Sequence, residues 1–136
     1  MKTLIVYNSK TGKTRKYSEE IRDCLLARQI SVELVSIQDF DNSRLNNLDV
    51  LLLGCWTSGL MLFLQHPEKI WVEFANKLPD MKNIKVGLFT TYLLATGSMF
   101  KNMKKQLEGK ASNIIIELKS KSGLISESDK EKLQLI

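Results

Sequence analysis

The sequence has 136 residues, of which 43% are hydrophobic and 26% are charged, and these values predict one globular domain over residues 1–136. Two cysteines are too few for a disulfide framework, and one histidine beside them argues against a metal site. The net charge is +5 at pH 7, but no aromatic residues interleave the lysines, so we expect a solvated basic surface and no nucleic-acid partner.

The uncharged stretches of the chain are short. The apolar segment after Lys2 is too short for a signal peptide. The uncharged run between Asp49 and Gln65 is shorter than the ~20 residues that cross a bilayer. We therefore expect a soluble, cytoplasmic protein with no membrane partner.

Apolar runs alternate with amphipathic segments along the whole chain. The helix near the N-terminus is typical, because Tyr17, Ile21 and Leu25 share one face of it. Near the C-terminus, Ser128 and Glu131 have the spacing of a capping box. In chain order the pattern predicts strand 3–7, helix 14–28, strand 31–37, a short helix or turn within 39–48, strand 50–53, loop 54–65, helix 67–78, strand 85–90, helix 99–109, strand 113–118 and helix 126–135.

This alternation predicts the α/β fold class. Strands that are separated by helices form a parallel sheet with helices on both faces. Five strands in a chain of this length suit the doubly wound order 2-1-3-4-5, in which a ligand binds beyond the carboxyl ends of the strands. The segments 8–14, 54–65 and 90–98 should then meet in one site.

The segment 8–14 has the features of an anion cradle. It lies between a strand and a helix, where backbone N–H groups without intrahelical partners point outward and the helix dipole adds positive charge. Ser9, Thr11 and Thr14 offer hydroxyl donors, and Gly12 allows the backbone to turn closely around an anion.

Two nucleotide-binding interpretations compete for this loop, and a solvated loop is the third. Gly12-Lys13-Thr14 matches the end of a Walker P-loop, but Tyr7 stands where that motif begins with glycine. Asp49 also precedes its strand instead of closing it, which leaves no acid to hold magnesium. Segment 9–14 fits the alternative pattern [ST]-x-T-G-x-T at every fixed position.

The whole chain resembles a short-chain flavodoxin, on three loops that follow strands. The resemblance implies a flavodoxin-like doubly wound fold, bound flavin mononucleotide (FMN) and electron transfer. It implies that the first loop holds the FMN phosphate, that an aromatic residue of the second stacks on the flavin ring, and that the third contacts the other side of the ring. The residues concerned are Ser9, Lys10, Thr11, Gly12, Lys13 and Thr14, then Cys55, Trp56, Thr57, Ser58 and Gly59, and then Thr90, Thr91 and Tyr92.

The tryptophans are expected to differ in their environment. Trp56 lies in an uncharged loop at the carboxyl edge of the sheet, where its flat apolar face suits a planar ligand. Trp71 falls on the apolar stripe of a helix and is expected in the core. Tyr92 either contacts the ligand or covers its own loop, and His66 is expected to be a capping or surface residue.

The chain departs from the usual flavodoxin pattern in its charge. Flavodoxins are usually acidic, whereas this chain is basic and has no Asp or Glu within 54–64 or 90–100. The second loop continues into the apolar run 60–64, which would make an exposed patch for a partner or substrate.

These observations favour an FMN-binding electron-transfer protein that works with a redox partner protein, either a reductase or an acceptor enzyme. An electron carrier is favoured over an enzyme with its own turnover, and no catalytic side chain is expected. Two alternatives stay open: an FMN-dependent NAD(P)H or quinone reductase-like enzyme, and a flavin-free interaction module.

Overall fold

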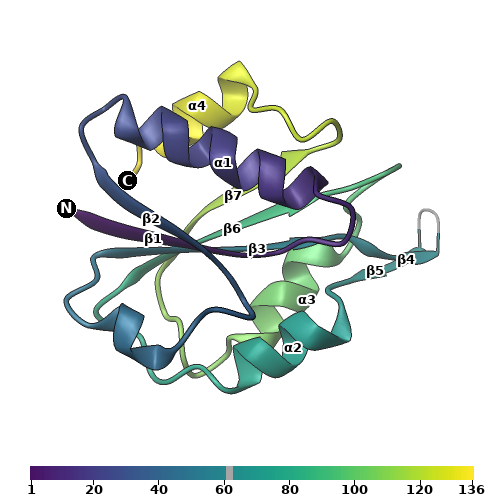
Figure 1. The fold of residues 1–136 in the computed structure, drawn as a ribbon. Coiled ribbons are helices and arrows are strands. Elements are labelled where there is room, and N and C mark those ends of the chain that lie inside the picture. The colour runs from purple at the N-terminus through teal and green to yellow at the C-terminus, as the bar shows by residue number, and fades with distance from the viewer. Residues whose placement is uncertain (61–62) are drawn as a thin grey trace.

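The computed structural model describes residues 1–60 and 63–136. Its centre is a five-stranded parallel sheet in the order β2-β1-β3-β6-β7 (Figure 1). Because β4 and β5 form a separate sheet, β6 and β7 are the fourth and fifth strands of this one along the chain. The order is therefore the predicted doubly wound order 2-1-3-4-5, and the predicted fold class is confirmed. The strands are β1 Lys2–Asn8, β2 Ser31–Ser36, β3 Val50–Trp56, β6 Lys85–Thr91 and β7 Ile114–Ser120.

Helices cover both faces of this sheet, with α1 and α4 on one face and α2 and α3 on the other (Figure 1). They are α1 Lys13–Leu26, α2 Lys69–Asn76, α3 Met99–Gln106 and α4 Glu127–Leu133, with a 3-10 helix over Asn42–Leu45. The helix or turn predicted within 39–48 is thus confirmed. No helix in the described parts of the chain is both long and apolar enough to cross a membrane.

The core has two layers, one on each face of the sheet. On the α2–α3 face, Trp71 is fully buried with the side chains that β3 directs there. On the α1–α4 face, Tyr17 packs edge-on against Phe89, with ring centroids 5.9 Å apart. A Cβ built on Gly54 would lie 2.0 Å from the Phe89 ring, so this position of β3 requires glycine.

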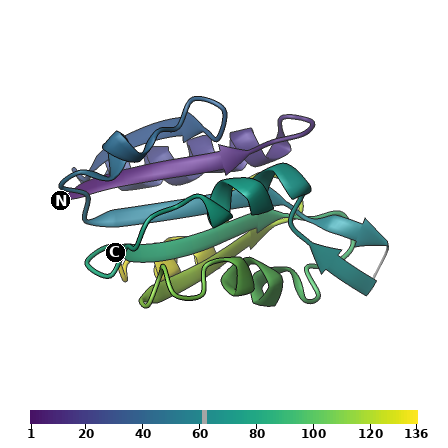
Figure 2. The same cartoon turned by 90° about the horizontal axis from the view of Figure 1, so that it is seen from below.

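The segment 54–65 differs from the prediction of a loop. The strand β3 continues to Trp56, and the chain then forms an antiparallel pair, β4 Ser58–Leu60 and β5 Phe63–His66. The pair projects from the carboxyl end of the sheet, while both chain termini lie at the opposite end (Figures 1 and 2). The prediction of a loop was wrong because this run carries no residue that breaks a strand between Leu60 and His66.

Two helix starts also differ from prediction. Pro67 precedes α2 instead of forming its first residue, because Glu68 occupies the cap position in an extended conformation. The capping box of α4 is formed by Ser126 and Asp129, two residues before the predicted pair of Ser128 and Glu131.

Candidate functional site

The carboxyl ends of β1, β3 and β6 bring the three predicted loops together, as parallel strands require. They enclose an open cavity of about 360 Å³. The residues that line it are Lys10, Thr11, Lys13, Thr14, Trp56, Thr57, Ser58, Thr91, Tyr92 and Leu93. Nine of these ten were predicted site residues; Leu93 was not.

The first loop turns tightly into the 14-residue helix α1. Gly12 caps the helix with φ of 94°, in the left-handed region, while no atom lies within 4 Å of a Cβ built on it. Glycine is therefore required here by the backbone conformation and not by crowding. The Ser9 hydroxyl accepts hydrogen bonds from the N–H groups of Gly12 and Arg15, at 3.1 and 3.3 Å, and holds the turn in shape.

The same turn leaves backbone donors available. Within residues 1–60 and 63–136, the N–H groups of Thr11, Lys13 and Thr14 have no hydrogen-bond partner in the protein. They lie at the positive end of the helix dipole, beside the Lys10 and Lys13 side chains that line the cavity. This arrangement can bind a phosphate without any rearrangement of the helix start.

Hydroxyl groups join the three loops beneath the cavity. The Thr14 and Thr91 hydroxyls are 2.6 Å apart and buried, which fixes the first loop to the third. The Thr57 N–H donates to the Thr91 carbonyl at 2.8 Å, and the Thr57 and Thr90 hydroxyls are 2.8 Å apart. The second and third loops are therefore held at a fixed separation, which defines the width of the cavity.

The indole of Trp56 stands at the edge of this cavity, half-buried. Its Nε1–H donates a hydrogen bond of 2.6 Å to Glu68 Oε2, and the Lys10 ammonium lies 4.8 Å from its ring centroid. Trp71, in contrast, is completely buried, as predicted. Tyr92 is half-buried and lines the cavity, and its N–H donates to the Ser120 carbonyl at 3.2 Å.

Two predicted residues have buried side chains that do not line the cavity, namely Cys55 and Thr90. Both are fully buried, and Thr90 donates its hydroxyl hydrogen bond to the Cys55 carbonyl at 2.6 Å. Burial raises the pKa of the Cys55 thiol from 9.0 to about 12. Their side chains therefore lie within the strand ends and not at the cavity surface, and their part in cofactor binding stays a prediction.

Other predicted residues do not line the cavity. Gly59 belongs to β4, and Ser9 supports the first loop without lining the cavity. The side chains of the apolar run 60–64 lie outside what the structure describes. His66 is exposed, as expected for a surface residue.

Sequence reasoning missed Glu68, which contacts Trp56 and Asn8. The Asn8 amide donates to the same Glu68 oxygen at 2.9 Å. Asn8 ends β1 and Glu68 precedes α2, so the chain separates these residues by 60 positions. No local pattern could have paired them.

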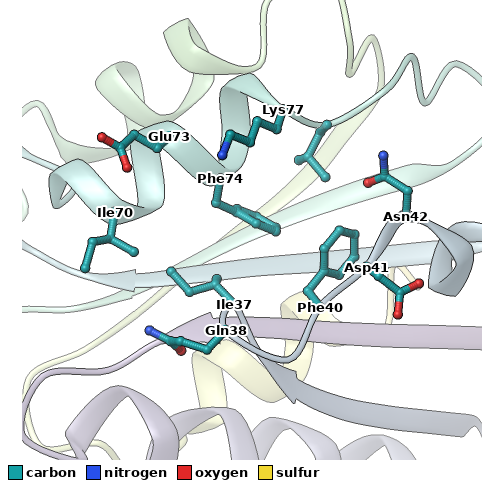
Figure 3. A pocket seen from close by; sticks show the side chains of 10 residues that line it. Ile37, Gln38, Phe40, Asp41, Asn42, Ile70, Glu73, Phe74 and Lys77 are labelled. Carbon is teal, nitrogen blue, oxygen red and sulfur yellow. The ribbon is translucent and has the colours of Figure 1, made fainter.

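A second cavity of about 480 Å³ lies between the segment after β2 and helix α2 (Figure 3). The rings of Phe40 and Phe74 form its floor, edge to face with centroids 5.1 Å apart. Asp41 and Glu73 at its rim oppose anion binding, and Lys77 is the one cation among its lining residues. This cavity is larger, but two carboxylates lie among its lining residues, whereas the lining of the carboxyl-edge cavity has two lysines and no carboxylate.

A family model described as Flavodoxin matches residues 5–135 of the chain. The chain belongs to the flavodoxin family. The flavodoxin of Megasphaera elsdenii is 33% identical over 113 residues, which are 82% of this chain and 80% of that protein. The flavodoxin of Clostridium beijerinckii is 28% identical over 105 residues, 77% of this chain and 75% of its own length.

A solved flavodoxin structure also has the fold of this chain. The solution structure of two-electron reduced Megasphaera elsdenii flavodoxin superimposes with a TM-score of 0.77 at 28% identity, and the match covers 96% of this chain and 94% of that one. The predicted resemblance is thereby confirmed. This flavodoxin is an FMN-binding electron-transfer protein. The cavity fits FMN chemically, because it offers donors for a phosphate and a planar aromatic face for a ring.

Proposed function

We propose that this flavodoxin holds the FMN phosphate in the loop 9–14 and the flavin ring between Trp56 and Tyr92. The observation that carries the proposal is the meeting of two features in one cavity. The N–H groups of Thr11, Lys13 and Thr14 have no partner among the described residues, and the indole of Trp56 lines the same cavity. FMN is the ligand that needs both, since it joins an anion to a flat ring.

A structural neighbour supports this assignment. A Fusobacterium nucleatum flavodoxin variant was solved bound to flavin mononucleotide, and it superimposes with a TM-score of 0.65 at 15% identity, over 84% of this chain and 67% of that one. The shared fold places the carboxyl ends of corresponding strands at the same edge. We assign the ligand to that edge of this chain as well.

The residues of the cavity bind and orient the cofactor, and FMN supplies the electron-transfer chemistry when it is bound. The lining residues are hydroxyl, ammonium, aromatic and aliphatic, with no carboxylate, imidazole or thiol among them. We therefore propose a carrier that passes electrons between a reductase and an acceptor enzyme, and not an enzyme with its own substrate.

We propose that the carrier works in the cytoplasm. Its two cysteines, Cys24 and Cys55, are both free thiols. Unpaired cysteines are typical of proteins in a reducing compartment.

The carrier assignment is tested by electron transfer from NADH and NADPH. The purified FMN-loaded protein should oxidise neither nucleotide by itself, and it should accept electrons when a flavodoxin reductase is added. Cytochrome c reduction reports the transfer in both cases. Rapid NAD(P)H oxidation without a reductase would instead identify an FMN-dependent reductase, and failure to bind added FMN would identify a flavin-free interaction module.

A further inference from the structure

Glu68 lies beside the cofactor cavity without lining it. Its Oε2 accepts hydrogen bonds from Trp56 Nε1 at 2.6 Å and from Asn8 Nδ2 at 2.9 Å. We propose that Glu68 is a positioning residue that fixes the indole plane of Trp56 for stacking on the flavin. This inference rests on the proposed function, since it takes Trp56 as the stacking residue.

The place of Trp56 explains why its ring needs an anchor. It is the last residue of β3, and its side chain is only half-buried at the edge of the sheet. The second torsion of a tryptophan side chain has broad preferences, so packing on one side does not define the ring plane. A charge-assisted hydrogen bond at the indole nitrogen does define it, because the N–H lies in the plane of the ring.

The anchor is itself held from a different strand. Asn8 ends β1, is 4% exposed, and directs its amide to both the Glu68 carboxylate and, at 3.8 Å, the Cys55 sulfur. The carboxylate therefore cannot swing away without breaking the Asn8 contact. Glu68 thus links the ring of Trp56 to Asn8 at the end of β1, the strand that leads into the phosphate loop. This link fixes the position of the proposed ring-binding residue relative to the proposed phosphate-binding loop.

Nearby positive charge makes a carboxylate tolerable at this half-buried position. Glu68 is the residue that caps α2, where the helix dipole favours a negative charge. The Lys10 ammonium lies over the same indole that donates to Glu68. A carboxylate here also opposes the build-up of negative charge in the cavity, so its removal should raise the reduction potential of the bound cofactor.

The binding test uses Glu68→Ala and Glu68→Gln, each in the natural chain and in a Trp56→Phe background. Phenylalanine keeps an aromatic face but has no N–H for Glu68. We expect Glu68→Ala to weaken FMN binding about 10-fold in the natural chain and less than about 2-fold beside Trp56→Phe, because the hydrogen bond between the indole and the carboxylate is lost only in the first case, whereas the Asn8 contact is lost in both. Glu73→Gln, on the exposed face of the same helix, is the matched control and should leave the affinity unchanged.

Glu68→Gln separates geometry from charge. Glutamine keeps an acceptor oxygen for Trp56 and Asn8, so it should retain more affinity than Glu68→Ala. It should also raise the midpoint potential relative to the Glu73→Gln control. A loss of affinity that is equal in both Trp56 backgrounds, or no loss at all in Glu68→Ala, would overturn the positioning role.

A measurement on the flavin-free protein separates this proposal from the proposed function. In a Trp71→Phe background the fluorescence anisotropy reports Trp56 alone, and Glu68→Ala should lower it by freeing the ring. An unchanged anisotropy would overturn the anchoring itself. If the anisotropy falls while Trp56→Ala binds FMN as tightly as the natural chain, the anchor stands and the stacking assigned to Trp56 fails.

Discussion

Trp56 and Trp71 show how the same residue type serves two purposes. Trp71 is fully enclosed between α2 and the sheet, and its indole nitrogen has no hydrogen-bond partner among the described residues. Trp56 is half-exposed, and its nitrogen is bonded to Glu68. Trp71 therefore contributes packing, whereas Trp56 offers a face to a ligand.

The two tryptophans should respond differently to substitution. Trp56→Ala should weaken FMN binding by roughly 1–3 kcal/mol, from lost apolar area and ring stacking. Trp71→Phe should lower the free energy of unfolding and leave the affinity for FMN nearly unchanged. Fluorescence titration of flavin and urea denaturation measure the two quantities. If Trp71→Phe released the flavin and Trp56→Ala kept it, the assignment of the stacking residue to Trp56 would be wrong.

The two cysteines should differ in reactivity. Cys24 is half-buried on α1, and Cys55 is fully enclosed in β3. Burial raises the pKa of the Cys55 thiol to about 12. At pH 8 a thiol reagent should label Cys24 first and Cys55 only on unfolding, with Cys24→Ser as the control. Fast labelling of Cys55 in the folded Cys24→Ser variant would contradict its burial.

The same pKa shift has a consequence for stability at high pH. The unfolded chain loses the Cys55 proton near pH 9.0, and the folded protein loses it only near pH 12. The unfolded state therefore binds fewer protons in this window, so the free energy of unfolding should fall as pH rises from 9 to 12. Burial and the hydrogen bond to Asp129 also raise the pKa of Tyr17, which acts in the same direction. Urea denaturation at a series of pH values measures the decline.

At the scale of elements, α1 and α4 are joined by a buried polar contact. The Tyr17 hydroxyl donates to Asp129 Oδ2 at 2.7 Å, and the same carboxylate accepts from the Ser126 N–H that begins α4. Asp129 is only 3% exposed. The contact holds α4 against the helix whose first turn forms the phosphate loop.

Tyr17→Phe should lower the free energy of unfolding by about 1–3 kcal/mol, because it leaves a buried carboxylate without this donor. The ring contact with Phe89 would remain. Tyr7→Phe is the control, because Tyr7 is half-buried and its hydroxyl has no partner among the described residues. Equal stability of the two variants in urea would show that water replaces the tyrosine hydroxyl.

Much of the arrangement of these elements could be predicted from the sequence. Uniformly apolar strands such as 50–53, alternating with amphipathic helices such as 14–28, fix a parallel sheet, and the position of each loop then follows. The pattern could not show that β3 and β6 continue into the predicted loops, which buries the Cys55 and Thr90 side chains. The contact of Glu68 with Trp56 depends on the approach of a strand end to a helix start, and no local spacing encodes it.

At the scale of the whole molecule, charge sets this flavodoxin apart from acidic members of its family. The net charge is +5, and the residues that line the cofactor cavity include Lys10 and Lys13 but no carboxylate. A carboxylate ~6–12 Å from the flavin opposes a negative charge on it by about 1–3 kcal/mol at an effective dielectric near 20. Glu68, which contacts Trp56 beside the cavity, opposes such a charge, whereas the loops that line the cavity add no carboxylate.

The potential for the second electron should therefore lie above that of an acidic flavodoxin. A difference of 1.4 kcal/mol corresponds to about 59 mV for one electron, so one missing carboxylate is measurable. Spectroelectrochemical titration of both proteins in the same buffer makes the comparison. An equal or lower potential in this protein would mean that exclusion of water or hydrogen bonds to the ring outweigh the charges of the loops.

The affinity of the flavin-free protein for FMN and for riboflavin tests the central claim most directly. The two ligands share the ring, and only FMN carries the phosphate that the N–H groups of Thr11, Lys13 and Thr14 are proposed to bind. Hydrogen bonds to a charged group contribute about 1.5–3 kcal/mol each, so FMN should bind at least ~100-fold more tightly. Equal dissociation constants for FMN and riboflavin would contradict the assignment of the phosphate to this loop.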